Sequence, residues 1–216
     1  MESNQSEVKP SQALTPKGQR TRKNILDAAR RVFSSSGYVG MRMTDVASEA
    51  GLSLGALYRY FEQKDDLFLS VVEDIHEELY AVTRAGYTGS FKKEPYETLY
   101  RSNLGYMRHY YENREVMRAF IEATMVDTRY RDMWWYMRER HIKPVVAALY
   151  RDHGISEIRG VSATKVVEAL ASTTEQSAFV WFSQAQLCSD ITDVTTAAKV
   201  ITDIWYFALF ESVDRV

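Results

Sequence analysis

The chain has 216 residues, of which 45% are hydrophobic and 26% charged, and its formal net charge is −2. This length allows one large domain or a small and a larger one, and the hydrophobic fraction is sufficient for a full core. The single cysteine, Cys188, excludes an intrachain disulfide and fits a reducing cytoplasm, and the absence of any run of 18 apolar residues argues against a membrane span.

The N-terminal residues 1–19 are polar, contain Pro10 and Pro16, and lack the apolar stretch of a signal peptide. They predict a flexible arm. Residues 1–64 hold 10 Lys and Arg against 6 Asp and Glu, a net charge of +4, which leaves −6 for the remainder. A basic N-terminal part on an acidic remainder is typical of a nucleic-acid-binding module joined to a second domain.

Helical periodicity dominates the chain, and the first helix is expected over residues 21–36, with Gly37 ending it. Residues 44–64 then have the pattern of a helix-turn-helix. Thr44 fits the N-cap of a short helix, Gly51 supplies the left-handed residue that ends it, and Ser53 caps a second helix over 54–61. In that second helix the core face is formed by Leu57 and Phe61, and the opposite face by Leu54, Gly55, Tyr58 and Arg59.

A short helix with small and polar groups on its free face fits the major groove of DNA, where its N-terminal residues read the bases. Neighbouring hydroxyl and basic groups suit phosphate oxygens. The candidate DNA-binding residues are Arg42, Thr44, Ser53, Leu54, Gly55, Tyr58, Arg59, Tyr60 and Lys64. The alternative is an ordinary turn between two helices, with the two tyrosines as packing residues.

The stretch from Arg20 to about Phe68 resembles the DNA-binding domain of the TetR/AcrR (tetracycline-repressor-like) family of bacterial one-component transcriptional regulators. The resemblance is carried by Ile25, Ala28, Ala29, Phe33, Gly37, Tyr38, Thr44, Val46, Ala47, Ala50, Gly51, Leu52, Ser53, Gly55, Leu57, Tyr58, Tyr60, Phe61, Lys64 and Leu67. It implies an all-α fold of about nine helices. A three-helix DNA-binding domain would occupy residues 20–66, and a larger helical ligand-binding and dimerisation domain residues 67–216.

The resemblance also implies a ligand-responsive regulator, taken here as a repressor, that binds a palindromic operator as a homodimer and is released by a small effector. The alternatives are a DNA-binding activator and a constitutive DNA binder without an effector. The sequence shows no Gly-rich phosphate loop and no cluster of metal ligands, and Cys188 lies in no recognisable catalytic motif. We therefore expect neither an enzyme nor a bound metal or other cofactor.

Further helices are expected over residues 64–84, 95–111, 115–126, 129–151 with an interruption or kink at Pro144, 163–186 and 192–214, with a loop over 156–162. The first of these helices is shared by both domains.

The middle helices are rich in aromatic residues and methionine, which suits a cavity for a largely apolar or aromatic ligand but is also usual for a core. The candidate ligand-binding residues are Tyr106, Tyr110, Met117, Phe120, Met125, Trp134, Met137, His141 and Phe179. The polar side chains on these helices could orient a ligand or could equally form satisfied pairs: Arg118, Glu122, His141, Glu175 and Gln176. The chemical class of the ligand stays open.

The last helix is apolar on several sides and must be covered on more than one face. The resemblance implies that the last two helices pair with those of a second subunit as a four-helix bundle; the alternative is one deep core within a monomer. The candidate dimer residues are Val167, Leu170, Trp181, Ile204, Trp205 and Leu209.

Overall fold

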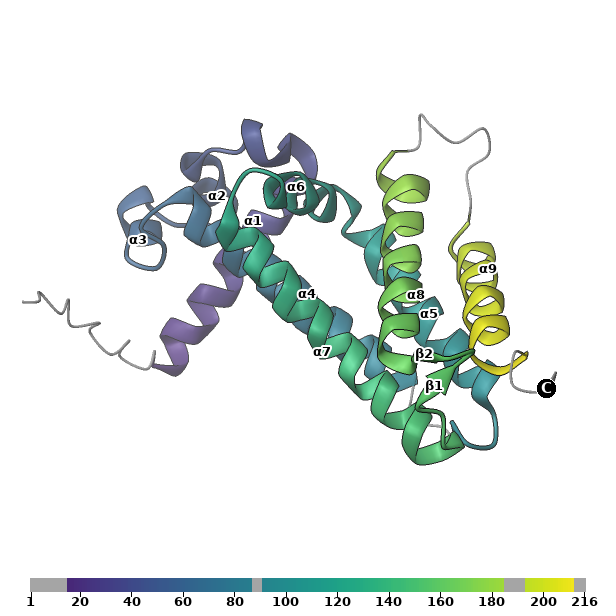
Figure 1. The fold of residues 1–216 in the computed structure, drawn as a ribbon. Coiled ribbons are helices and arrows are strands. Elements are labelled where there is room, and N and C mark those ends of the chain that lie inside the picture. Colours follow the sequence, from purple (N-terminus) through teal and green to yellow (C-terminus); the bar gives the residue numbers. More distant parts are fainter. Residues whose placement is uncertain (1–14, 87–90, 185–192, 212–216) are drawn as a thin grey trace, which may run out of the picture.

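The structure is a computed structural model that describes residues 15–86, 91–184 and 193–211. These residues form nine α-helices and one short two-stranded hairpin. The predicted all-α fold is thus confirmed. Figure 1 shows α1–α3 at one end of the molecule and α8 and α9 at the other, with α4 and α7 running between them. Within the described ranges no helix is long and apolar enough to cross a membrane.

The N-terminal domain consists of α1 (Pro16–Gly40), α2 (Met43–Glu49) and α3 (Leu54–Tyr58). Helix α1 begins five residues before the predicted start, because the Thr15 hydroxyl accepts a hydrogen bond from the Gly18 amide at 3.2 Å and Pro16 occupies the first turn. The last four residues of the predicted arm, 16–19, are therefore helical, and residues 1–14 lie outside the described ranges. Gly37 has φ +67°, and it breaks the helical conformation where predicted.

Two details of the predicted helix-turn-helix are wrong. The N-cap of α2 is Arg42 rather than Thr44, and Thr44 lies exposed in the first turn with its hydroxyl 3.4 Å from the Asp45 carboxylate. Because the buried Met43 already belongs to the helix, α2 begins two residues before the predicted start. Helix α3 ends at Tyr58, and the amides of residues 60 and 61 complete a turn on the Leu57 carbonyl.

The remaining elements are α4 (Lys64–Gly86), α5 (Pro95–Glu112), α6 (Arg114–Thr124), α7 (Thr128–His153), β1 (Glu157–Ile158), β2 (Val161–Ser162), α8 (Ala163–Ala178), η1 (Phe179–Ser183), α9 (Val194–Tyr206) and η3 (Phe207–Glu211). The two η segments are π-helical ends of α8 and α9. Helix α7 runs through Pro144 without interruption. The predicted loop over 156–162 contains the hairpin, whose turn places Arg159 and Gly160 at positive φ.

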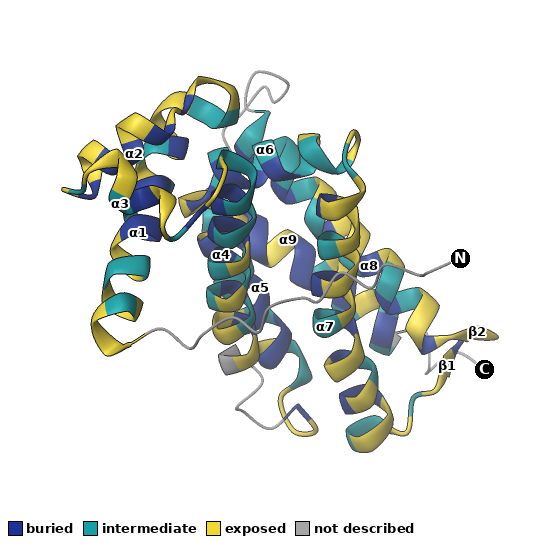
Figure 2. Ribbon diagram, turned by 90° about the vertical axis from the view of Figure 1, so that its left-hand side faces the viewer, coloured by how far each residue is buried: buried dark blue, intermediate teal, exposed yellow. Residues whose placement is uncertain are grey.

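One hydrophobic core runs through both parts of the chain, and α4 belongs to both. Figure 2 shows buried residues concentrated on the inner faces of the central helices, whereas much of α2 and α3 is exposed. Phe68 and Ile75 on α4 are completely buried, the first beside α1 and the second beside α5. The second domain therefore continues from the DNA-binding-like domain without a flexible linker.

Candidate DNA-binding surface and internal cavity

The turn between α2 and α3 has the geometry that its sequence predicts. Gly51 adopts φ +67°, and the Leu52 amide donates to the Ala47 carbonyl at 2.8 Å. The Ser53 hydroxyl accepts from the Ala56 amide at 3.2 Å, so Ser53 is the N-cap of α3. Leu57 is completely buried and fixes which face of this short helix points outwards.

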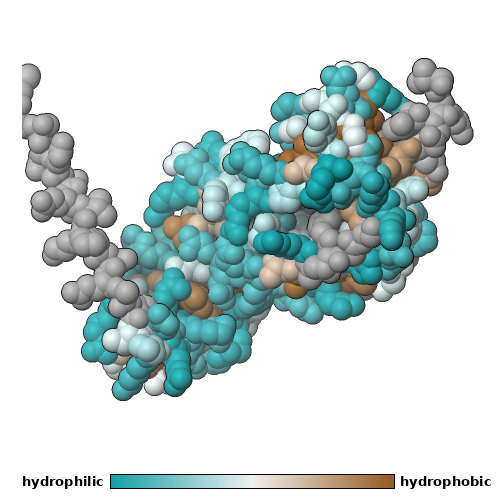
Figure 3. Space-filling model, turned by 90° about the horizontal axis from the view of Figure 1, so that it is seen from below, coloured by the Kyte–Doolittle hydropathy of each residue, from teal (hydrophilic) through white to brown (hydrophobic). Residues whose placement is uncertain are grey.

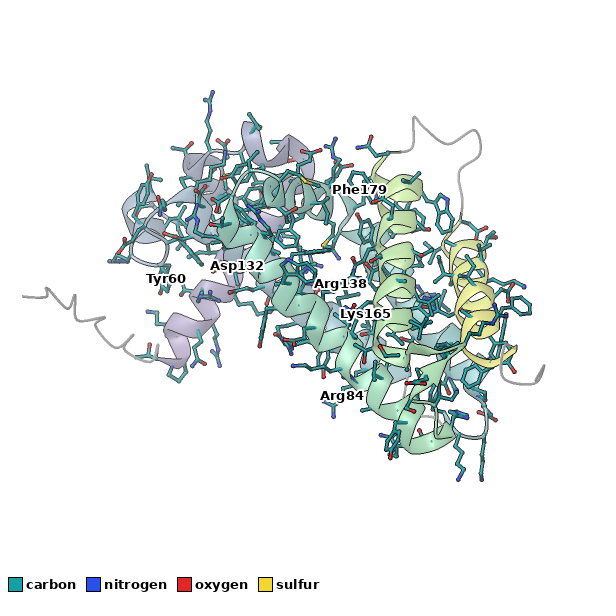
Figure 4. All side chains as sticks on the ribbon, viewed as in Figure 1. Tyr60, Arg84, Asp132, Arg138, Lys165 and Phe179 are labelled. Carbon is teal, nitrogen blue, oxygen red and sulfur yellow. The ribbon has the colours of Figure 1, made fainter. Side chains whose placement is uncertain are left out.

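The outward face of α3 carries the predicted contact residues. Arg42, Ser53, Leu54, Gly55, Tyr58 and Arg59 are all exposed. Tyr60, labelled in Figure 4 at the α3 end of the molecule, is half-buried against the core. Lys64 is also half-buried, with its ammonium 4.6 Å from the centre of the Tyr38 ring and 3.4 Å from the Val39 carbonyl, and burial lowers its pKa.

An aromatic cluster joins α1, α4 and α7 at the junction of the two domains. The Phe68 ring lies 4.9 Å from Phe33, 4.6 Å from Tyr38 and 5.6 Å from Tyr130. The Tyr38 hydroxyl donates to Asp65, which also accepts from Arg129 at 3.0 Å. The junction is thus both packed and hydrogen-bonded.

A second junction centres on Arg30 of α1. Its guanidinium donates to both carboxylate oxygens of Glu78 at 3.0 and 2.9 Å and to the Asn113 side-chain oxygen at 2.7 Å. Asn113 is buried and donates to the His109 carbonyl at 2.8 Å, and the His109 ring contacts the Ile75 carbonyl at 2.8 Å. One side chain of the first domain therefore connects α4 with the boundary of α5 and α6.

The second domain encloses a cavity of about 580 Å³ between α4, α5, α6, α7, α8 and α9. Six of the nine predicted ligand residues line it: Tyr106, Tyr110, Met117, Trp134, Met137 and His141. Its lining side chains Arg84, Pro144 and Arg151 are exposed, so the cavity opens near the end of α4 and the second half of α7.

The other three predicted ligand residues lie elsewhere. Phe120 is completely buried and packs against His76 and Tyr130. Met125 follows the end of α6 and is 78% exposed. Phe179 begins the π-helical end of α8 and packs on the core rather than on the cavity.

An ion pair between the buried Arg138 of α7, labelled in Figure 4, and the half-buried Glu175 of α8 forms part of the cavity wall. Arg138 donates to the Glu175 carboxylate, to the Glu168 carbonyl and to the Ser172 hydroxyl. Burial raises the pKa of Glu175 to about 7, although Arg138 opposes the shift. Arg138 could not be identified from the sequence, because its partners lie 30 or more residues away on another helix.

His76 also lines the cavity, and neither of its buried ring nitrogens has a hydrogen-bond partner among the described residues. Burial lowers its pKa to about 3, and that of His141 to about 4. A neutral His76 therefore stabilises the fold fully above its ordinary pKa of 6.5, and this contribution is lost as the pH falls towards 3.

We expect His76→Phe to remove this pH dependence while keeping the ring contact with Phe120. Between pH 7.5 and pH 5, the wild-type protein should lose about 2 kcal/mol of unfolding free energy relative to the variant, because only the unfolded wild-type chain gains this proton. Urea unfolding of both proteins across this range measures the difference. Parallel pH curves would contradict a buried neutral imidazole.

The predicted dimer residues divide into two groups. Val167, Leu170, Trp205 and Leu209 are buried within the subunit, and the Trp205 indole donates to the Thr174 hydroxyl at 2.9 Å. These four side chains are therefore part of the subunit's own core, and their role in a dimer interface stays a prediction. Ile204 is 40% exposed and Trp181 half-buried, so only these two face outwards to any extent.

The described residues contain no group of three His, Cys, Asp or Glu side chains arranged to hold a metal ion. Figure 3 shows one face of the molecule, where hydrophilic side chains cover most of the surface and hydrophobic ones are scattered at both ends.

Comparisons with known proteins address the first domain most directly. Residues 25–71 match the family model described as bacterial regulatory proteins of the tetR family. The chain is 30% identical over 113 residues to the HTH-type transcriptional regulator AcrR of Shigella flexneri, covering 52% of this chain and 46% of that protein. It is 44% identical over 57 residues to the HTH-type transcriptional repressor NicS of Pseudomonas putida, covering 26% and 27%. The chain thus matches less than half the length of each relative.

Solved structures share the fold over most of the chain. A TetR-like transcriptional regulator from Rhodococcus sp. RHA1 superposes with a TM-score of 0.65 at 20% identity, covering 91% of this chain and 98% of that chain. The fatty acid degradation regulator FadR of Bacillus halodurans superposes with a TM-score of 0.68 at 16% identity, covering 87% and 97%. Both relatives are named as transcriptional regulators, as the sequence predicts for this chain. Residues 25–71 therefore match the tetR family of bacterial regulatory proteins, and the described part of the chain shares its fold with TetR-like regulators.

Proposed function

We propose that the chain is a DNA-binding transcriptional repressor that acts as a homodimer on a palindromic operator and is released by a small, largely apolar effector. The observation that carries the proposal is the free face of α3. Leu57 anchors this helix in the core, while Leu54, Gly55 and Tyr58 are exposed with Ser53 at its N-cap. Side chains at the N-terminus of such a helix reach base edges in the major groove.

Support for a homodimer comes from one side of α9 and η3. Val200, Ile204 and Phe207 are 40%, 40% and 52% exposed and recur at helical spacing, so they form an apolar stripe on the surface. A symmetric pair of subunits would cover this stripe and place two recognition helices on one side of the DNA. We therefore propose this exposed stripe as the dimer interface, in place of the predicted residues that are buried within the subunit.

Support for an effector comes from the position of α4, which begins six residues after α3 ends and lines the cavity with His76, Leu79, Tyr80 and Thr83. A ligand that favours one orientation of α4 would shift the population towards dimers whose recognition helices no longer match the two half-sites. The ratio of the ligand's affinities for the two states sets how far the operator affinity falls.

Selection of duplexes from a random DNA library with the full-length protein tests the DNA-binding part. We expect an inverted repeat whose half-site centres lie about 34–36 Å apart or a multiple of this distance. Light scattering of the complex should give two chains per duplex. An asymmetric site bound by one chain would reject the homodimer, and the absence of any enriched sequence would reject specific recognition.

Gly55→Ala separates DNA contact from folding. A Cβ atom built on Gly55 meets nothing within 4 Å, so the variant should be as stable as the wild type or more stable by up to about 1 kcal/mol. The affinity for the selected operator should fall about tenfold, equivalent to about 1.4 kcal/mol, because the methyl group occupies the surface that approaches DNA. Urea unfolding and fluorescence anisotropy measure the two effects, and unchanged affinity would place Gly55 outside the interface.

A further inference from the structure

The cavity is elongated. Its lining residues on α7 extend from Trp134 to Asp152, about 27 Å along the helix at 1.5 Å per residue. Apolar and aromatic side chains such as Leu79, Met137 and Val145 make up most of its wall. An occupant that fills this volume must itself be long and largely apolar.

The charges inside the cavity are paired with each other, and Arg84, the one lining charge without an ion-pair partner among the described residues, is exposed at the mouth. Arg138 contacts Glu175, and at the mouth the Arg151 guanidinium lies 2.7 Å from an Asp152 oxygen. Two further bonds, to the Glu168 carbonyl and the Ser172 hydroxyl, hold the Arg138 guanidinium against α8. Neither pair leaves an excess charge that would compensate a charged ligand inside the cavity.

The interior disfavours charge of either sign. Burial keeps the pKa of His76 and His141 far below 6.5, so neither ring is a cation at neutral pH. Burial also raises the pKa of Glu175 to about 7 although it touches an arginine, so an anion is disfavoured too. A charged group inside the cavity would meet the same loss of hydration without a free partner, and an ion pair with the exposed Arg84 at the mouth would contribute little.

Polar groups nevertheless remain for hydrogen bonding. Among the described residues, none bonds to the His141 Nε2 atom, to the second carboxylate oxygen of Glu175 or to the Tyr106 hydroxyl. All three residues line the cavity. Together they offer donors and acceptors that a hydroxyl or carbonyl group can use without carrying charge.

We propose that the cavity binds an uncharged, elongated, largely apolar molecule that carries hydroxyl or carbonyl groups. The proposal rests on the proposed function, since this molecule would be the effector. The paired arginine and glutamate exclude charged analogues of the same size, because bringing a third charge into the wall leaves one of the three without a partner.

Three probes with the same ten-carbon chain test the proposal: 1-decanol, decanoate and decylammonium, all below their micellar concentrations at pH 7.5. Isothermal titration of the full-length protein should give an affinity for 1-decanol about tenfold or more above that for either charged probe. Equal or tighter binding of decanoate or decylammonium would overturn the proposal. Binding of none of the three up to the solubility limit of 1-decanol would overturn it as well.

Variants of the ion pair show whether paired charge sets this selectivity. In Glu175→Gln, Arg138 loses its counter-charge, and decanoate affinity should rise about tenfold relative to that of 1-decanol. The double variant Arg138→Met/Glu175→Gln removes both charges and should prefer 1-decanol again. Circular dichroism confirms folding of both. A preference that is unchanged in Glu175→Gln would show that the pair does not control ligand charge.

The result of the ligand titrations does not depend on whether the protein recognises DNA. Operator affinity of the ligand-free protein tests the proposed repressor, whereas the titrations test the chemical class of the occupant. If 1-decanol binds selectively but leaves operator affinity unchanged, the ligand class stands and effector-driven release fails. If the selected DNA binds and none of the three probes does, specific DNA recognition stands and the proposed ligand class fails.

Discussion

Phe68→Ala should lower the free energy of unfolding by about 3–5 kcal/mol, which is the usual range for removing a fully buried phenylalanine. Phe68 is completely buried, and its ring contacts Phe33, Tyr38 and Tyr130 from three sides. The truncation leaves a cavity between helices of both domains, which cannot collapse without moving α1 against α7. Urea unfolding followed by circular dichroism measures the loss.

The matched control is Tyr150→Ala on α7. Its side chain is 67% exposed, so the unfolding free energy should change by less than about 0.5 kcal/mol. If Phe68→Ala cost as little as the control, the aromatic cluster would not hold the domains together. If it produced two separate unfolding transitions, the cluster would couple the domains without supplying most of the stability of either.

Arg30→Met should cost about 1–3 kcal/mol, because it leaves Glu78 and the buried Asn113 without their shared donor. A double-mutant cycle with Glu78→Gln isolates the contribution of the pair. We expect a coupling free energy of about 1–3 kcal/mol between the two positions, since Arg30 binds both carboxylate oxygens in a parallel geometry. Both groups are partly exposed, and so the lower half of this range fits best.

The cycle is measured by urea unfolding at low and high salt. Strictly additive losses would show that the ion pair contributes nothing beyond each residue's own packing. A coupling that disappears in high salt would mark it as a screened surface pair rather than a domain contact.

Local chemistry explains why the helix-turn-helix could be predicted. Gly51 must take a left-handed conformation, Ser53 has a side chain that caps a helix, and Leu57 is apolar at the one position that faces the core; each rule operates within a few residues. The Thr44 cap was mispredicted because an exposed hydroxyl gives the same local signal whether it stands at the cap or in the first turn.

Long-range packing explains what could not be predicted. Tyr106 and Phe120 are both aromatic residues on the apolar sides of their helices, yet one lines the cavity and the other packs in the core. Trp205 has the apolar spacing of an interface residue, but α8 of the same subunit covers it. Periodicity indicates that a side chain is covered, and it does not indicate by which helix.

The length of α4 gives the cavity a mechanical advantage. Arg84, at the cavity mouth, and Lys64, the first residue of α4 and in contact with Tyr38 of α1, lie on one continuous helix about 30 Å apart at 1.5 Å per residue. Pivoting this rod by 5° about its cavity end moves the other end by about 2.6 Å, close to the 3.4 Å rise of one base pair. In the proposed homodimer the two symmetry-related helices would double the change in separation, so an occupant would need to displace the cavity wall by only a fraction of an atomic diameter.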